Sequence, residues 1–148
     1  MGIAYHWLMS PLARKPDAFE VSIHRLPEFT SVKLSGPATL DDFVALIEGM
    51  ADESRHLRDR RMLVDQLEIT TTLKFTDHFR IGEEVARHMQ HLEKMASVVP
   101  PDKITHTSEK VAVQQGMQLR VFTSMTDAIH WLGEAGPLPP LPGTLPHR

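Results

Sequence analysis

Three consecutive strand–helix units occupy the chain from Arg61 to Leu132, and this alternation constrains the fold more than any other feature. Each unit pairs a short apolar run with a helix-forming stretch, and the last unit extends from Val121 to Leu132. Alternation of this kind predicts a small α/β domain with a partly parallel sheet. Because parallel sheets place their functional loops at the carboxyl ends of the strands, the search for a site narrows to a few short segments.

The segment before these units predicts a β-hairpin followed by a helix. Apolar and polar residues alternate over residues 19–25 and again over 29–35, which is the period of half-buried strands. Thr39 and Asp42 then stand at the spacing of a capping box, in which each satisfies a free backbone N–H of the first turn. Apolar residues behind them keep helical spacing, so we predict a helix over residues 40–57.

The middle of the chain predicts a short central strand and a long polar loop. Met62 to Val64 is an apolar run that ends at Asp65, and residues 66–75 read as a threonine-rich loop. Thr76 and Asp77 then open a second helix. The apolar stripe of that helix comprises His78, Gly82, Val85, Met89 and Leu92.

The remaining elements are short and clearly bounded. Residues 95–99 predict a strand that stops at two prolines, and residues 119–122 predict the last strand. Ser124 begins a final helix that ends at Gly133. From Gly136 onward the chain is rich in proline, and we expect that segment to be disordered or in polyproline II form.

Particular motifs at these positions resemble a known family. They are Leu63-Val64-Asp65, Phe79-x-Ile81-Gly82 and Val121-Phe122, together with the segment from Asp127 to Leu132. On these residues the chain resembles the STAS domain superfamily, and within it the SpoIIAA-like branch related to anti-sigma-factor antagonists. The resemblance implies a single α/β domain over residues 19–133, with a mixed sheet of about five strands and about four helices. It leaves an N-terminal arm over residues 1–18 and a Pro-rich tail over 134–148.

The resemblance also implies a function. Such a domain is a non-enzymatic regulatory module that acts through protein contacts. In the better-known relatives a Ser or Thr at the start of the helix after the central strand is phosphorylated by a partner kinase, within an Asp-Ser-Ser-Gly-like motif. The corresponding stretch here, Phe75 to Phe79, offers Thr76 as its hydroxyl and lacks the glycine. The resemblance therefore makes Thr76 the candidate phosphoacceptor.

The chemistry of the residues leaves a structural alternative open for each member of this site. A phosphate on Thr76 would be stabilised by the helix N-terminus, but Thr is also a preferred N-cap, worth about 1 kcal/mol. Asp65 either faces a ligand or accepts backbone N–H bonds from the loop. The hydroxyls of the threonine run suit a polar ligand and equally an extended loop. The predicted partner- or anion-binding site comprises Asp65, Thr70, Thr71, Thr72, Thr76 and Asp77.

Composition excludes several other classes of function. The formal charge of −3 includes no basic block, which argues against nucleic-acid binding. The chain has no cysteine, which excludes thiolate metal sites and cysteine nucleophiles, and no apolar run long enough to span a bilayer. We therefore expect a cytoplasmic protein without a cofactor. Among nine histidines, His88 and His91 lie with Glu84 along one side of the second helix, which we interpret as a solvated flank rather than a metal site.

Three further hypotheses remain open from the sequence. Met50, Met89 and Met95 stand at core-facing positions and suit an adaptable pocket for a small apolar or lipid-like ligand. A homodimer is expected if Trp7, Leu8 and Met9 of the arm pack on a second copy. The third is an unrecognised hydrolase that uses a histidine, for which the candidates are His24, His78 and His106.

Overall fold

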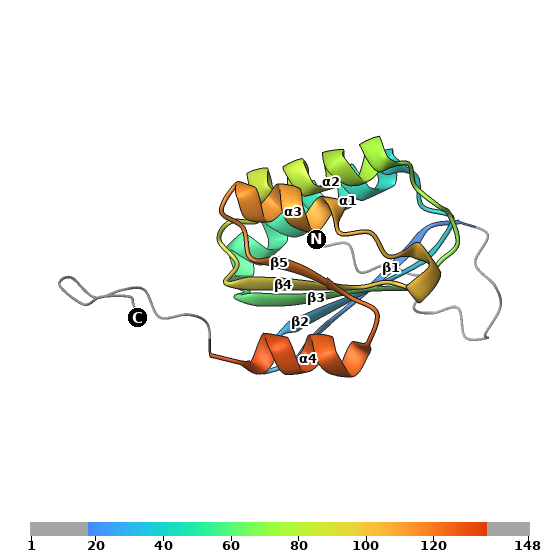
Figure 1. Ribbon diagram of the computed structural model, residues 1–148. Helices are drawn as coiled ribbons and strands as arrows, with labels where there is room; N and C mark the ends of the chain where they lie inside the picture. The colour runs from blue at the N-terminus through green and yellow to red at the C-terminus, as the bar shows by residue number, and fades with distance from the viewer. Residues whose placement is uncertain (1–17, 136–148) are drawn as a thin grey trace, which may run out of the picture.

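Residues 18–135 are described by the computed structural model, and they form a five-stranded sheet with four α-helices (Figure 1). The expected disorder of the proline-rich tail and the expected homodimer contact of the arm concern residues outside this range. The elements of the domain are β1 (Glu20–Arg25), β2 (Thr30–Gly36), α1 (Leu40–Leu57), β3 (Arg61–Ile69), α2 (Phe75–His88), β4 (Lys94–Val98), the 3-10 turn η2 (Pro101–Lys103), α3 (Thr107–Gln114), β5 (Leu119–Phe122) and α4 (Met125–Gly133).

The sheet is mixed and its strands follow the order of the chain, β1-β2-β3-β4-β5. β1 and β2 pair antiparallel as a hairpin, and β2 to β5 are parallel. The helices that connect the parallel strands, α1, α2 and α3, cover one face, while α4 lies against the other face (Figure 1). The predicted α/β fold with a mixed sheet is therefore confirmed.

Local capping fixes the ends of two helices as the sequence predicts. The Thr39 hydroxyl accepts a hydrogen bond from the backbone N–H of Asp42 at 3.2 Å, and the Asp42 carboxylate accepts one from the N–H of Thr39 at 2.9 Å. This capping box starts α1 at Leu40. Ser124 similarly accepts a hydrogen bond from the N–H of Asp127 at 3.1 Å and starts α4.

Two apolar layers hold the sheet in place. The larger lies between the sheet and α1, α2 and α3, and its most deeply buried large side chains are Val32, Leu34, Met50, Met62 and Met89. The smaller lies under α4 and contains Leu63, Ala96, Val98, Ala128 and Leu132. Successive residues of β3 contribute to opposite layers, which is why its central run is apolar throughout.

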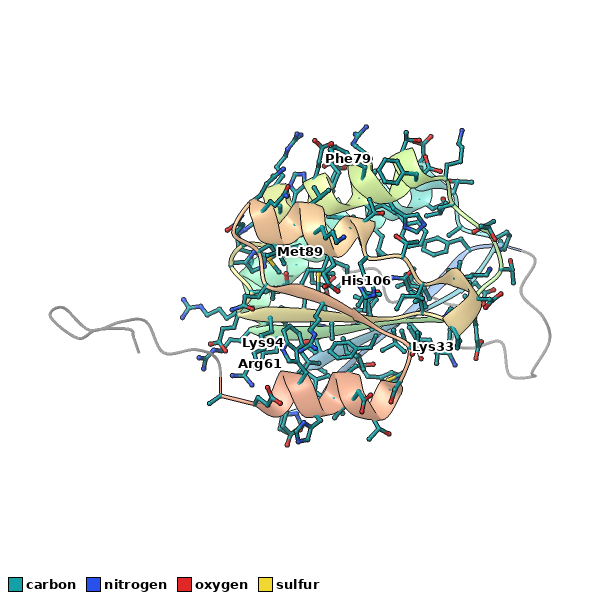
Figure 2. The ribbon with its side chains drawn as sticks, in the orientation of Figure 1. Lys33, Arg61, Phe79, Met89, Lys94 and His106 are labelled. Carbon is teal, nitrogen blue, oxygen red and sulfur yellow. The ribbon has the colours of Figure 1, made fainter. Side chains whose placement is uncertain are left out.

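A buried lysine anchors the far end of α4. Lys94 is 4% exposed, and its ammonium donates to the carbonyl oxygens of Trp131 at 2.7 Å and Glu134 at 2.9 Å. The guanidinium of Arg61 donates to the carbonyl of Leu132, and Figure 2 shows Lys94 and Arg61 together beside this helix end. Two cations therefore satisfy free carbonyls at the negative end of the helix dipole.

Candidate functional site

The carboxyl ends of the parallel strands meet at one edge of the sheet, where loops from different parts of the chain enclose a pocket of about 170 Å³. The loop after β3 and the segment after β4 supply most of its wall. Both apolar and polar side chains line it. The lining residues are Phe43, Gln66, Ile69, Thr71, Thr72, Leu73, His78, Val99, Pro100, Asp102, Lys103, Ile104 and Thr105.

Hydrogen bonds from two sides hold the loop after β3. The hydroxyl of Thr71 donates to the carbonyl oxygen of Ala38 at 2.6 Å. The ammonium of Lys103 donates to the carbonyl oxygens of Ile69 at 3.2 Å and Thr71 at 3.0 Å. The threonine run is thus tied to both the start of α1 and the segment after β4, which gives the loop a defined position.

Asp65 does not end its strand, because β3 continues to Ile69. The register of the pairing between β2 and β3 shifts between Lys33 and Ser35. Beyond this shift the end of β2 pairs with Glu68 and Ile69, which extends β3 to Ile69. The predicted loop over residues 66–75 is therefore wrong in its first four residues, which are strand. The carboxylate of Asp65 accepts the backbone N–H of Leu67 at 3.0 Å, as the structural alternative predicts, and Asp65 lies outside the pocket lining.

Thr76 does not cap α2, because the helix begins at Phe75 with Lys74 at the N-cap, two residues earlier than a Thr76 cap would place them. The carboxylate of Asp77 accepts the backbone N–H of Lys74 at 3.1 Å, so Asp77 stabilises the first turn. Thr76 is exposed in that turn. Of the six predicted site residues, only Thr71 and Thr72 line the pocket.

Gln66, His78 and Lys103 are polar residues of the pocket that we did not predict as members of this site. Gln66 donates through Nε2 to the hydroxyl of Ser97 at 2.6 Å. Burial lowers the pKa of His78, although the charge of Asp77 partly offsets the effect, so the imidazole favours its neutral form. No local motif marks these residues, because they converge only when β3, α2 and the segment after β4 come together.

An exposed aromatic pair lies beside this pocket, on the first two turns of α2. Phe75 is 68% exposed and Phe79 is 43% exposed, and their ring centroids are 6.5 Å apart. Figure 2 shows Phe79 on the side of α2 that faces away from the sheet. We call Phe75, Thr76 and Phe79, together with the loop over residues 70–74, the α2 surface. Large exposed apolar side chains that touch one another commonly mark protein contacts.

A second, smaller cavity of about 60 Å³ lies inside the main core. Met50, Met89 and Met95 all line it, as do Phe43 and Gln66, which also line the larger pocket. The three methionines are each at most 6% exposed. The core-facing positions predicted for them are therefore confirmed.

The interpretation of Glu84, His88 and His91 as a solvated flank is wrong. Glu84 is only 2% exposed, and its carboxylate contacts the side chains of Arg80 at 2.9 Å and His88 at 3.1 Å. His91 turns elsewhere, and its Nε2 lies 2.7 Å from the hydroxyl of the buried Ser54. α2 ends at His88, so His91 lies beyond the predicted helix, and helical spacing alone cannot show that α1 packs against α2.

The chain is a small α/β domain with a five-stranded mixed sheet, and it exposes a pair of phenylalanines at the start of α2. A family model described as SpoIIAA-like matches residues 29–133, more than half of the chain. The chain belongs to the SpoIIAA-like family. Comparison with curated protein sequences found no match.

Two solved structures share the fold. An anti-sigma factor antagonist from Mycobacterium paratuberculosis is 11% identical with a TM-score of 0.57, and the match covers 82% of this chain and 100% of that chain. An uncharacterised DUF3478-family protein with a SpoIIAA-like fold, from Shewanella loihica, is 16% identical with a TM-score of 0.50, covering 82% and 98% of the two chains. Within residues 18–135, no helix is long and apolar enough to cross a membrane.

Proposed function

We propose that this protein is a non-enzymatic regulatory module of the cytoplasm that binds a protein partner through the α2 surface. The observation that carries the proposal is the exposure of Phe75 and Phe79, which touch each other at the start of α2. Burying aromatic side chains commonly supplies much of the free energy of a protein–protein contact. The name of the Mycobacterium paratuberculosis relative, an anti-sigma factor antagonist, supports a partner of this kind.

Thr76 offers a means of regulating such a contact. It is exposed and stands between the two phenylalanines in sequence, at the positive end of the α2 dipole. A phosphate there would gain from the free N–H groups of the first turn and would add about −1.5 to −2 charges to an otherwise apolar contact. Phosphorylation of Thr76 would therefore leave the domain folded and weaken the binding of a partner that packs on the phenylalanines.

Affinity capture from cells of the source organism, followed by titration with the purified partner, tests this function. We expect Phe79→Ser and Thr76→Glu each to weaken binding by at least about tenfold, which corresponds to about 1.4 kcal/mol. Ile129→Ser is the matched control, because Ile129 has a similar exposure of 41% but lies on α4, across the sheet from α2. Unchanged affinity in both α2 variants would refute the proposed surface.

A small apolar ligand is the second candidate function, because the three core-facing methionines do line a common cavity. The cavity of about 60 Å³ is smaller than the roughly 150 Å³ that holds a benzene molecule, so a ligand would need the flexible methionines to move. Native mass spectrometry of protein purified from its own host tests this. A retained non-protein mass that Met89→Trp abolishes would support the ligand, and its absence from the wild-type protein would exclude one that survives purification.

A further inference from the structure

Two helices that pack against each other bring two carboxylates and an imidazole together on the helical side of the sheet. Glu48 comes from α1, and Glu84 and His88 stand one turn apart on α2. One ligand atom from each residue lies within 4.8 Å of the other two. Glu84 is 2% exposed, His88 is half-buried and Glu48 is exposed, so the group has an inner end and a solvent-facing end.

The distances within this group suit a metal ion. Oε1 of Glu84 and Nε2 of His88 are 3.1 Å apart. Two ligands bonded to zinc at about 2.0 Å in tetrahedral geometry are separated by about 3.3 Å, so these atoms need almost no movement. The side chain of Glu48 is exposed and can close the remaining gap. Water would complete the coordination at the open end.

The other oxygen of Glu84 is already held by arginines. Oε2 accepts a hydrogen bond from Nε of Arg80 at 2.9 Å, and Nη1 of Arg87 lies 3.7 Å away. Such contacts orient a metal-binding carboxylate from the outer coordination shell, and they leave Oε1 directed at His88. Arg80 and Arg87 would therefore not have to move when a metal binds.

Burial and the two arginines act on the pKa of Glu84 in opposite directions. Burial raises its pKa, but the hydrogen bond from Arg80 and the charge of Arg87 outweigh that effect, and the pKa lies below its ordinary value. The carboxylate is therefore ionised although it is buried. Arg–Glu pairs spaced i, i+4 also form on exposed helix surfaces. The Arg80–Glu84 pair therefore does not by itself explain why Glu84 is buried.

From this geometry we infer that Glu48, Glu84 and His88 form a binding site for a divalent metal of the zinc type. One nitrogen and two carboxylate oxygens are a donor set that Zn²⁺ accepts readily. A bound metal would take the place of the direct contact between His88 and Glu84 and would join α1 to α2. His91 is not a ligand, because it is engaged with Ser54.

Zinc titration of the untagged, chelator-treated full chain tests this inference, with a chromophoric chelator as competitor. We expect one zinc ion per chain at this site and a rise in the melting temperature on binding. Glu48→Gln and His88→Gln should each weaken the affinity by more than about tenfold, since even outer-shell partners typically account for about 10–100-fold. Because Glu48 is exposed, Glu48→Gln should fold normally and keep the test valid if His88→Gln does not.

His130→Gln is the matched control. Nδ1 of His130 lies 3.4 Å from the carboxylate of Glu134, again at i, i+4, but both side chains are exposed and no third metal ligand stands near them within the described residues. This variant should bind zinc as the wild type does. Failure of the wild type to bind zinc would overturn the inference. So would an unchanged affinity in both Glu48→Gln and His88→Gln, because the metal would then bind elsewhere.

Discussion

At the scale of single residues, Gly82 shows how closely α2 and α3 approach. A Cβ atom on Gly82 would stand 2.6 Å from the carbonyl oxygen of Ser108 and 2.9 Å from the Cβ of Val111. Glycine ordinarily weakens a helix interior by about 1 kcal/mol relative to alanine, so its presence here needs a packing reason. The backbone of α3 supplies that reason.

Gly82→Ala should therefore destabilise the protein, although alanine is the better helix former. We expect a loss of about 1–3 kcal/mol in the free energy of unfolding, because the backbone of Ser108 must move. Gly133→Ala is the control, since a Cβ there meets nothing within 4 Å, and it should change stability by less than about 1 kcal/mol. Urea unfolding measures both, and equal effects would contradict the packing argument.

Two histidines make stability depend on pH. Burial lowers the pKa of His78 and of His91 below the ordinary value of 6.5. Between the native pKa and 6.5 the unfolded chain binds more protons than the native protein, so the stability falls as the pH falls through this window. Urea unfolding between about pH 7.5 and 5.5 should show this decline, and His78→Gln should make it shallower. A slope that His78→Gln leaves unchanged would contradict the account.

At the scale of elements, the two helix starts with a threonine behave differently. Thr39 closes a complete capping box at α1, whereas Thr76 lies inside the first turn of α2 with Asp77 in the capping role. Thr39→Ala should lower the free energy of unfolding by about 1 kcal/mol. Thr76→Ala should change it by less than about 0.5 kcal/mol. Thermal unfolding compares the two variants. A larger loss of unfolding free energy for Thr76→Ala than for Thr39→Ala would indicate that Thr76 caps α2.

The sequence predicted elements well where local signals agree with the tertiary structure. The capping residues placed the starts of α1 and α4 correctly, and the alternation placed the strands of the hairpin to within one residue. The length of β3 was missed because Gln66 and Glu68 are polar and Leu67 between them is exposed, and only pairing with β2 keeps this segment in the strand. The burial of Lys94 was also not predicted, because its hydrogen-bond partners are backbone carbonyls at the end of α4, far from it in the sequence.

At the scale of the whole molecule, the order of the strands explains why the site was harder to predict than the fold. β2 to β5 lie in the sheet in the order of the chain, so the helices that connect them all cover one face. Ligands of α/β sheets usually bind in the crevice at which the strand order reverses, and this order of strands forms no such crevice. The pocket and the α2 surface depend instead on how loops pack. The sequence locates Thr71 and Thr72, but the exposure of Phe75 and Phe79 depends on tertiary packing, in which the start of α3 lies against Gly82, beyond these two phenylalanines on α2.

Site-specific photo-crosslinking in cells of the source organism tests the proposed partner surface most directly. A photoreactive residue replaces Phe79 in one strain and Ile129 in another, two positions of nearly equal exposure, at 43% and 41%, on elements that lie on opposite faces of the sheet. We predict a discrete cross-linked protein from position 79, with a yield at least several-fold above that from position 129. Equal yields from the two positions, or a cross-link from position 129 alone, would contradict the account.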